Sequence, residues 1–416
     1  MLPPGCSRIW NFGTKLQAAA SPIGSALAIV LMLMVFAGPP AQAQVFTTLH
    51  TFTGGGDGAA PYAGLSMDRA GRLYGTASSG GRPSCDYCGT VFKMEHNGSS
   101  WLLVPLYEFS GPDGATPQAR VIIGPNGNLY GTTTYGGSAG KGVVFRLQPP
   151  ATACKTALCP WRETVLYSFA GGSDGAYPTF GDLTFDRQGN IYGTTPDGGS
   201  SSCAGVGCGV VYELSPSSGG WTEKILYAFQ GGQDGEAPVA GVVFDNAGNM
   251  YGTTVAGGAY QGGAVYELTP SGSGWTESII YSFTGQSDGY APYGGLIFDG
   301  AGNLYGTTFT GATAVYELSP SSGGWTFNVL HAFGAYEGSV ATLTFDAAGN
   351  LYGTLTIASQ EPAEVFRLTP SGGQWTVTGF AGEIGTYPLG NVVLDASGNL
   401  YTTAAGNPGY VFEVTP

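Results

Sequence analysis

The stretch Gly295-Leu296-Ile297-Phe298-Asp299-Gly300-Ala301-Gly302-Asn303-Leu304-Tyr305-Gly306-Thr307-Thr308 decides the fold, because it recurs with small changes along the chain. Mostly apolar residues lead into an Asp-x-x-Gly-Asn turn, and an apolar residue, Tyr, Gly and Thr follow it. A type I turn favours Asp at its first position, and Gly suits the left-handed residue that closes it with a bulge. The stretch therefore predicts a β-hairpin. Its tyrosine recurs as Tyr74, Tyr130, Tyr192, Tyr251, Tyr305, Tyr352 and Tyr401, which makes seven units.

Each unit contains four short segments, called a, b, c and d here, that are rich in β-branched and aromatic residues. Segment a precedes the turn, b carries the tyrosine, and c is represented by 210–214. Segment d opens with a tryptophan: Trp101, Trp161, Trp221, Trp275, Trp325 or Trp375. Units of roughly 50 to 60 residues have room for four strands each. We therefore predict an all-β fold, a seven-bladed β-propeller with four antiparallel strands per blade.

The two ends of the chain support a closed ring. Residues 45–52 match a d segment, and the chain stops at Pro416 just after the c segment 410–414. The last blade thus lacks its outer strand. We expect the N-terminal strand to complete it, which removes the exposed edges of an open stack.

The first 43 residues have the layout of a secretory signal peptide. Arg8 and Lys15 precede an apolar run, 23–37, and Ala41-Gln42-Ala43 is a small-x-small cleavage site. An uncleaved anchor is the alternative. We expect 44–416 to form a single propeller domain with no membrane span after processing, in a secreted or periplasmic protein that is a monomer.

The net charge argues against one class of partner. The whole chain carries 14 Lys and Arg against 28 Asp and Glu, a formal charge of −14. Binding of nucleic acid needs a basic surface, so nucleic acid is not an expected partner.

Six cysteines follow the signal segment, in three close pairs: Cys85 with Cys88, Cys154 with Cys159, and Cys203 with Cys208. An even number in an exported chain predicts three local disulfides. A redox Cys-x-x-Cys pair and a zinc site are the alternatives, but no histidine ligands accompany the pairs. We expect no metal and no cofactor.

The repeat resembles the GloVer (Gloeo/Verruco) tandem repeat of exported bacterial proteins. The likeness rests on 304–308, on the Gly198-Gly199 type of loop and on Val210-Val211-Tyr212-Glu213-Leu214. It covers nearly all of the chain after the signal segment. It implies an extracytoplasmic protein, and it brings no biochemical activity with it.

Two sets of aspartates stand out. Those of the a to b turns (Asp68, Asp186, Asp245, Asp299, Asp346 and Asp395) are expected to cap their own turns. The second set lies in Asp-Gly pairs between d and the next a: Asp57, Asp113, Asp174, Asp234 and Asp288. Turn capping is again the favoured interpretation, with calcium binding and ligand binding as alternatives. Glu337-Gly338 and Ile384-Gly385 take the matching places in the last two blades.

The loops from b to c vary most in length. Together with the d to a loops they lie on one side of a propeller, called the loop face here. Loops on a rigid scaffold commonly carry binding sites, and tyrosine suits contact with sugar or peptide. Tyr87, Tyr135, Lys141 and Tyr260 are therefore candidate ligand-binding residues, beside the five Asp-Gly aspartates.

The sequence offers little for catalysis. Of the three histidines, His50 and His331 occupy equivalent places in d segments and are expected to pack. We find no Ser-His-Asp or metal-ligand spacing. The favoured hypothesis is a non-catalytic scaffold that binds an extracellular polysaccharide or protein on its loop face. The alternative is a propeller hydrolase or lyase acting on extracellular carbohydrate.

Overall fold

The structure is a computed structural model and describes residues 45–150, 161–203, 205–334, 337–357, 364–381, 390–406 and 409–415. All of them belong to one compact unit, Gln44–Pro416. The proposed signal peptide, Cys154, Cys159 and Ile384 lie outside the described residues. Within those ranges, no helix has the length and apolar character needed to cross a bilayer.

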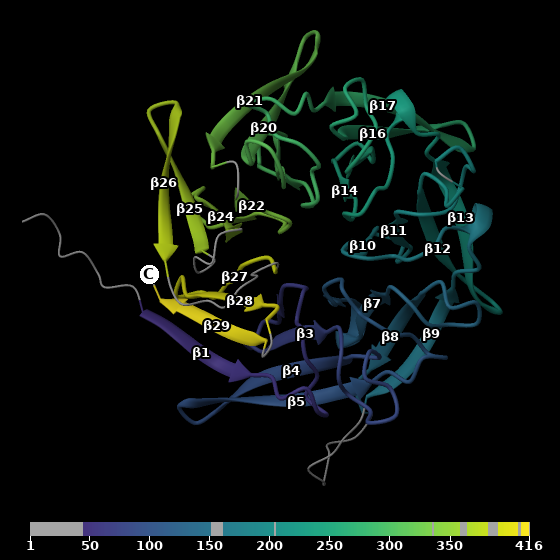
Figure 1. Cartoon of the computed structure of the whole chain (residues 1–416), viewed down its shortest axis with the longest axis vertical. Helices are drawn as coiled ribbons and strands as arrows, with labels where there is room; N and C mark the ends of the chain where they lie inside the picture. Colours follow the sequence, from purple (N-terminus) through teal and green to yellow (C-terminus); the bar gives the residue numbers. More distant parts are fainter. Residues whose placement is uncertain are drawn as a thin grey trace, which may run out of the picture. The chain divides into compact units, whose positions relative to one another are not determined.

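The compact unit is a seven-bladed propeller: seven small antiparallel sheets follow one another around a common centre (Figure 1). Blade one contains β2 (Ser66–Met67), β3 (Leu73–Ala77), β4 (Thr90–Asn97) and β5 (Ser100–Glu108), and blade two contains β6 (Ile122–Ile123), β7 (Leu129–Thr133), β8 (Val143–Gln148) and β9 (Arg162–Ser168). Blade three contains β10 (Thr184–Phe185), β11 (Ile191–Thr195), β12 (Val210–Ser217) and β13 (Gly220–Ala228), and blade four contains β14 (Val243–Phe244), β15 (Met250–Thr254), β16 (Ala264–Ser271) and β17 (Gly274–Ser282). Blade five contains β18 (Ile297–Phe298), β19 (Leu304–Thr307), β20 (Ala314–Ser321) and β21 (Gly324–Ala332). The predicted segments a to d are these strands in chain order.

Helical structure among the described residues is limited to three 3-10 turns in loops: η1 (Pro125–Gly127), η2 (Gly172–Asp174) and η3 (Gly232–Asp234). The all-β class is confirmed.

Blade six departs from the pattern. It contains β24 (Leu351–Ile357), β25 (Glu364–Ser371) and β26 (Gln374–Ala381), and two short strands, β22 (Glu337–Gly338) and β23 (Thr344–Phe345), both pair with β24. Where other blades have an Asp-Gly loop, Glu337-Gly338 extends the sheet opposite Ile357 and Thr356.

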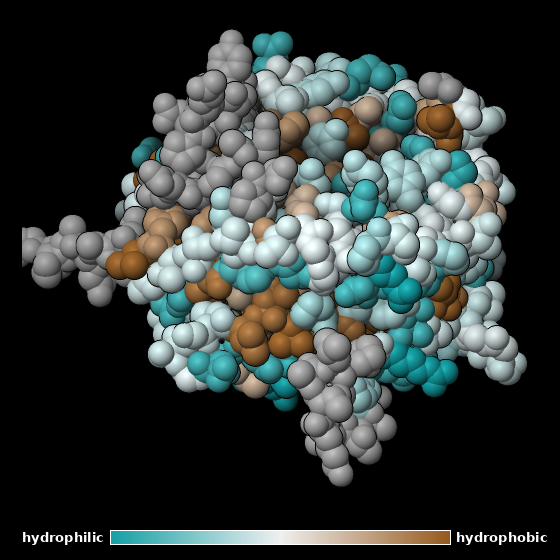
Figure 2. All heavy atoms as spheres, turned by 60° about the horizontal axis from the view of Figure 1, so that its bottom comes forward, coloured by the Kyte–Doolittle hydropathy of each residue, from teal (hydrophilic) through white to brown (hydrophobic). Residues whose placement is uncertain are grey.

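Blade seven joins the two ends of the ring. It contains β27 (Val393–Leu394), β28 (Leu400–Ala404), β29 (Tyr410–Thr415) and, as its outer strand, β1 (Val45–Thr51). The pairing is antiparallel, with Val45 opposite Thr415 and Thr51 opposite Tyr410. The predicted closure is confirmed. On the side of the ring that carries β1 and β5, brown apolar patches lie among white and teal atoms (Figure 2).

The hairpin turn has the predicted geometry. In blade five the Asp299 N–H donates to the Asn303 carbonyl over 3.0 Å, and the Gly302 N–H donates to the Asp299 carbonyl over 3.3 Å. Gly302 has φ +90°, a left-handed conformation that glycine adopts at little cost.

The core lies between blades rather than within them, and each apolar cluster combines side chains of two neighbours. Between blades four and five, for example, Phe283 packs edge-on against Tyr316 at 5.2 Å between ring centroids. Tyr316 is fully buried and lies across Gly306, its partner in the next strand. A Cβ at Gly306 would come within 2.4 Å of the Tyr316 hydroxyl. The glycine of each Tyr-Gly-Thr motif therefore makes room for a core aromatic.

Candidate functional site

The aspartates of the a to b turns are structural. Asp299 Oδ1 accepts hydrogen bonds from the N–H groups of Ala301 (2.8 Å) and Asn303 (2.9 Å), and Oδ2 accepts from the Asn303 amide (2.8 Å) and the Tyr305 hydroxyl (3.1 Å). Burial acts to raise the pKa of Asp299, but these hydrogen bonds hold it below its ordinary value. The same contacts recur at Asp186, Asp245, Asp346 and Asp395. Turn capping by these residues is confirmed.

The Asp-Gly aspartates also bond within their own loops. Asp288 accepts hydrogen bonds from the Thr284 N–H (2.7 Å), the Thr284 hydroxyl (2.6 Å) and the Tyr281 hydroxyl (3.0 Å). Burial acts to raise the pKa of Asp288, but the contacts with Thr284 and Tyr281 lower it overall. Asp113, Asp174 and Asp234 likewise accept from a tyrosine of the preceding strand and from a loop N–H. Capping is thus confirmed for this set, while a role in ligand binding stays a prediction.

In the first loop a histidine takes the place of the tyrosine. His50 packs edge-on against Phe52 at 5.0 Å between ring centroids, as expected, and its Nε2 also lies 3.0 Å from Asp57 Oδ2. Asp57 accepts further hydrogen bonds from the N–H and hydroxyl of Thr53. His50 thus does what the tyrosine does in the other copies. This residue, two places before the last aromatic of segment d, holds the Asp-Gly loop through its contact with the aspartate.

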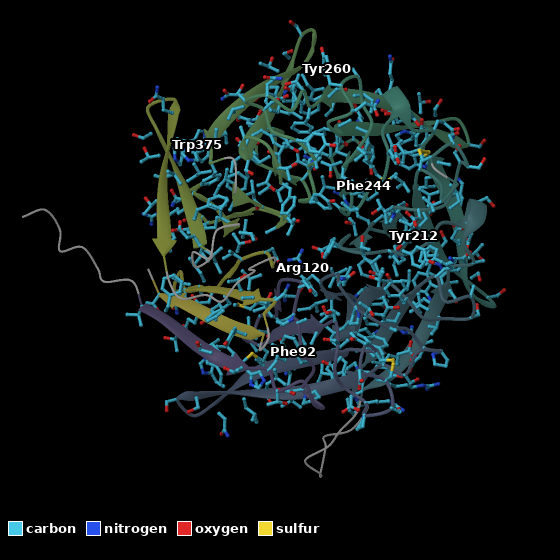
Figure 3. The ribbon with its side chains drawn as sticks, viewed as in Figure 1. Phe92, Arg120, Tyr212, Phe244, Tyr260 and Trp375 are labelled. Carbon is cyan, nitrogen blue, oxygen red and sulfur yellow. A yellow bond between two sulfur atoms is a disulfide. The ribbon has the colours of Figure 1, made fainter. Side chains whose placement is uncertain are left out.

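The candidate tyrosines are strongly exposed. Tyr87 exposes 76% of its surface, Tyr260 64% and Tyr135 51%, and Tyr290 of a d to a loop exposes 42%. Tyr260 lies on the outer part of the ring in Figure 3. They occur in the b to c loops of blades one, two and four and in the loop before blade five, so they are spread over the loop face.

Two of the predicted residues, Tyr135 and Lys141, meet at a third that sequence reasoning missed. Lys141 Nζ donates a hydrogen bond to the Tyr177 hydroxyl over 2.5 Å and lies 4.5 Å from the centre of its ring. Tyr135 packs edge-on against Tyr177, with the two ring centroids 5.4 Å apart. Asp197 lies near Lys141, and burial raises the pKa of Asp197 although the positive charge of Lys141 opposes the rise.

Tyr177 has an unusual backbone conformation. Its φ is +58°, which is uncommon for a bulky residue. The same place before proline has positive φ at Ala60, Thr116, Ala237 and Ala291. The Tyr177 N–H donates to the Lys141 carbonyl over 2.8 Å. The repeat thus imposes the conformation, and among the five copies with this conformation in the described residues Tyr177 is the one with an aromatic side chain. That difference was visible in the sequence as Tyr177-Pro178.

Two of the three predicted disulfides lie in described residues and are formed, Cys85–Cys88 and Cys203–Cys208. Cys154 and Cys159 lie outside the described residues. Cys203 and Cys208 are buried, and Cys203 Sγ would lie 2.5 Å from a Cβ at Gly231. This disulfide therefore packs the long loop of blade three onto the next d to a loop.

An ion pair at the centre of the ring was not predicted. Arg120 Nη2 lies 2.7 Å from Asp182 Oδ2, and Figure 3 places Arg120 at the middle of the propeller. A cavity of about 30 Å³, lined by Gln118 and Asn391 among others, adjoins them, which is room for about one water molecule. The sequence feature that could have indicated this ion pair is a charged residue at a position where other copies of the repeat have Gly64, Gly241 and Gly295.

Three glutamates in outer strands were also missed. Burial, together with the negative charge of an aspartate in the preceding loop, raises the pKa of Glu163 and Glu223 to about 7 and that of Glu277 to about 8. One carboxyl oxygen of each is buried without a hydrogen-bond partner. The sequence signal was Trp-x-Glu at the start of segment d.

Among the described side chains, no group of three His, Cys, Asp or Glu is placed to hold a metal ion. The candidate residues of the loop face are thus exposed tyrosine rings, the Lys141 ammonium and the aspartates of the Asp-Gly loops.

The profile of the Gloeobacter/Verrucomicrobia repeat matches residues 34–206 and 204–415. No curated protein matches the chain. Solved structures that resemble it include a gluconolactonase from Xanthomonas campestris (15% identity, TM-score 0.43, covering 90% of each chain). Another is a Carbohydrate-Active Enzymes family AA12 protein from Trichoderma reesei (13% identity, TM-score 0.43, covering 90% of this chain and 96% of that one). A third is a candidate 6-phosphogluconolactonase from Bacteroides uniformis (14% identity, TM-score 0.48, covering 76% and 84%).

Proposed function

The chain belongs to the Gloeobacter/Verrucomicrobia repeat family, and from this membership and the loop geometry we propose that it is an exported, non-catalytic binding scaffold. Its ligand is an extracellular polysaccharide or protein, held on the loop face. Two disulfides in the described residues support an oxidising, extracytoplasmic location. The observation that carries the proposal is the group formed by Tyr135, Lys141 and Tyr177.

This group has the features of a contact surface. Tyr135 is half exposed, yet its ring is fixed against Tyr177, whose backbone is held by the carbonyl of Lys141. An aromatic side chain that is ordered before binding loses little conformational entropy when it contacts a ligand. The Lys141 ammonium supplies a donor for ligand oxygens beside the rings. Ring faces with an adjacent donor suit sugar and peptide alike.

The aspartates near this surface support binding rather than turnover. Their oxygens are engaged by loop N–H groups and hydroxyls, and they serve to hold the loops. A hydrolase of the glycosidase type needs two carboxyls flanking the scissile bond. Glu277 and Asp234 lie near one another between two blades, where burial and the charge of Asp234 raise the pKa of Glu277 to about 8; we assign this pair to the blade interface rather than to a sugar site.

A glycan array and a pull-down from the extracellular fraction test the proposal with the full chain after export. Retention of intact sugar or of a protein is the expected result, and it should weaken in Tyr135→Ala and in Tyr260→Ala. Leu102→Ala, which removes an exposed side chain from β5, is the matched control and should bind normally.

Turnover is checked on the same ligands. Release of reducing ends or of unsaturated sugar products from a bound glycan would replace the scaffold by the carbohydrate hydrolase or lyase. Cell fractionation tests secretion against periplasmic retention, and light scattering tests the expected monomer.

A further inference from the structure

Three similar grooves lie on the side of the ring opposite the loop face. This side, called the turn face here, is formed by the a to b turns and the c to d turns. The grooves lie between blades one and two, three and four, and four and five, with volumes of about 850, 560 and 640 Å³ respectively. Ligand sites commonly have volumes of about 300 to 1,000 Å³. Each groove is large enough for a small ligand or for a segment of a polymer.

The grooves share their walls because they are built by the repeat. In the groove between blades four and five, Tyr251 of segment b forms the floor, Phe298 lies on the inner side, and Trp325 and Pro320 of the next blade lie on the outer side. The rings of Tyr251 and Trp325 meet edge-on at 5.6 Å, and those of Tyr251 and Phe298 at 5.4 Å. The groove between blades three and four repeats this set with Tyr192, Phe244 and Trp275. Figure 3 labels Phe244.

The aromatic walls are fixed before any ligand arrives. The Tyr251 hydroxyl donates to Glu267 over 2.7 Å and lies 3.3 Å from Asp245 Oδ2, so its ring is fixed at the polar end as well as by packing. Trp275 and Trp325 are partly buried, which leaves part of each indole open to the groove. A preformed aromatic wall lowers the entropic cost of binding.

The polar groups at the rim select the chemistry of the ligand. The lining of the groove between blades four and five includes Asp245, Asp299 and the exposed amide of Asn246, and contains no lysine or arginine. The carboxylates of Asp245 and Asp299 are engaged by their own turns, so the Asn246 amide offers the open acceptor for a hydroxyl group. The negative charge of the two aspartates disfavours an anionic ligand. Aromatic rings with hydroxyl acceptors beside them suit a neutral sugar, which has an apolar ring face and a hydroxyl edge.

We propose that these turn-face grooves bind neutral pyranose units of an extracellular glycan, one short stretch in each groove. The sites are separate from the loop face. Several weak sites on one rigid ring strengthen the hold on a polymer by avidity, because each later contact is intramolecular. Arginines stand at the rims of the other two grooves, Arg69 and Arg72 between blades one and two and Arg187 between blades three and four, so these two grooves tolerate an acidic sugar as well.

Groove-filling variants test the proposal without touching the core. Ala301→Arg fills the groove between blades four and five, and Ala247→Arg reaches both grooves that flank blade four, since Ala247 lines each of them. Both alanines are exposed in their turns. Ser322→Arg adds the same charge at an exposed tip on the same face and is the control.

The measurement is calorimetric titration with neutral gluco-, manno- and xylo-hexasaccharides, accompanied by tryptophan fluorescence. A proline-rich peptide and an oligouronate are included for comparison. We expect at least one neutral oligosaccharide to bind with a change in fluorescence. Ala301→Arg should lower the number of sites, and the double variant Ala247→Arg/Ala301→Arg should weaken binding by about tenfold or more, as loss of a central contact commonly does. Ser322→Arg should bind as the parent does.

Several outcomes would overturn the proposal. They are absence of binding by every neutral oligosaccharide, unchanged binding in the double variant while its melting temperature is normal, and binding of the peptide in place of sugar. Tyr135→Ala separates this site from the loop face. The change in tryptophan fluorescence should persist in this variant, because Trp325 and Trp275 line the grooves, while any sugar binding on the loop face should weaken.

Discussion

Phe327 of blade five lies flat against Tyr281 of blade four, with ring centroids 3.8 Å apart and ring planes 5° from parallel. In blades two to four the same place in the outer strand holds Glu163, Glu223 or Glu277. These glutamates lie near Asp113, Asp174 and Asp234 of the preceding blade and have raised pKa values. One structural position is thus filled by a stacked ring at one interface and by a partly buried carboxyl group at three others.

The carboxyl group makes stability depend on pH. The pKa of Glu277 is about 8 in the folded protein against 4.5 when exposed, so the unfolded chain releases this proton first as pH rises. The contribution of Glu277 to the free energy of unfolding is therefore fully present below pH 4.5. It falls progressively between pH 4.5 and about 8 and is smallest above pH 8. We expect Glu277→Gln to raise the free energy of unfolding by about 1 to 2 kcal/mol at pH 8.5, after allowance for solvent screening, and to change it little at pH 4.5. Urea denaturation at the two pH values measures the difference, and an equal effect at both would contradict it.

Glycine 306 offers a test of how the blades are packed. A Cβ there would meet the Tyr316 hydroxyl at 2.4 Å and its Cζ at 2.6 Å. Gly306→Ala should therefore cost about 2 to 3 kcal/mol, as overpacking of a core does. Gly300→Ala is the matched control, because nothing lies within 4 Å of its Cβ position. Its melting temperature should stay near that of the parent, and equal losses in both variants would count against the packing argument.

The hairpin turn is tested at Asp299. Asp299→Ala removes the acceptor of four hydrogen bonds, two of them from backbone N–H groups. Loss of such a cap typically costs about 1 to 2 kcal/mol. Asp299→Asn keeps one carbonyl oxygen and should lose less. Thermal unfolding of both variants at pH 7 ranks them; if the asparagine variant is the less stable of the two, the capping role is wrong.

The features that could be predicted from the sequence are those that recur in every repeat. The Asp-x-x-Gly-Asn turn, the tyrosine after it and the match of residues 45–52 to a d segment are local patterns, and they predicted the hairpins, the seven blades and the closed ring. Tyr177 and Arg120 are departures from the repeat, and their partners Lys141 and Asp182 come from other loops or blades. Such pairings depend on how neighbouring blades pack against one another. The spacing of residues within one repeat does not reveal that packing. The turn-face grooves were missed because each is made by two successive units.

Closure of the ring is tested by removal of β1. Deleting Val45–Thr51 exposes the edge of β29, which has paired with β1 along its whole length. We expect a lower melting temperature and self-association through the free edge, since an unpaired strand readily accepts another. Differential scanning fluorimetry and light scattering measure the two effects. Thr47→Ala, an exposed substitution within β1, should change neither; a monomeric deletion variant of normal stability would show that the seventh blade does not need this strand.

The pairing of β1 with β29 also affects the order in which the parts of the chain can fold. Of the described strands, β1 is synthesised first and its partner β29 last, so the ring cannot close until β29 has been made. Such a distant pairing is entropically slow to form. Closure of the ring is therefore expected to be a late step in folding, after the other blades have formed.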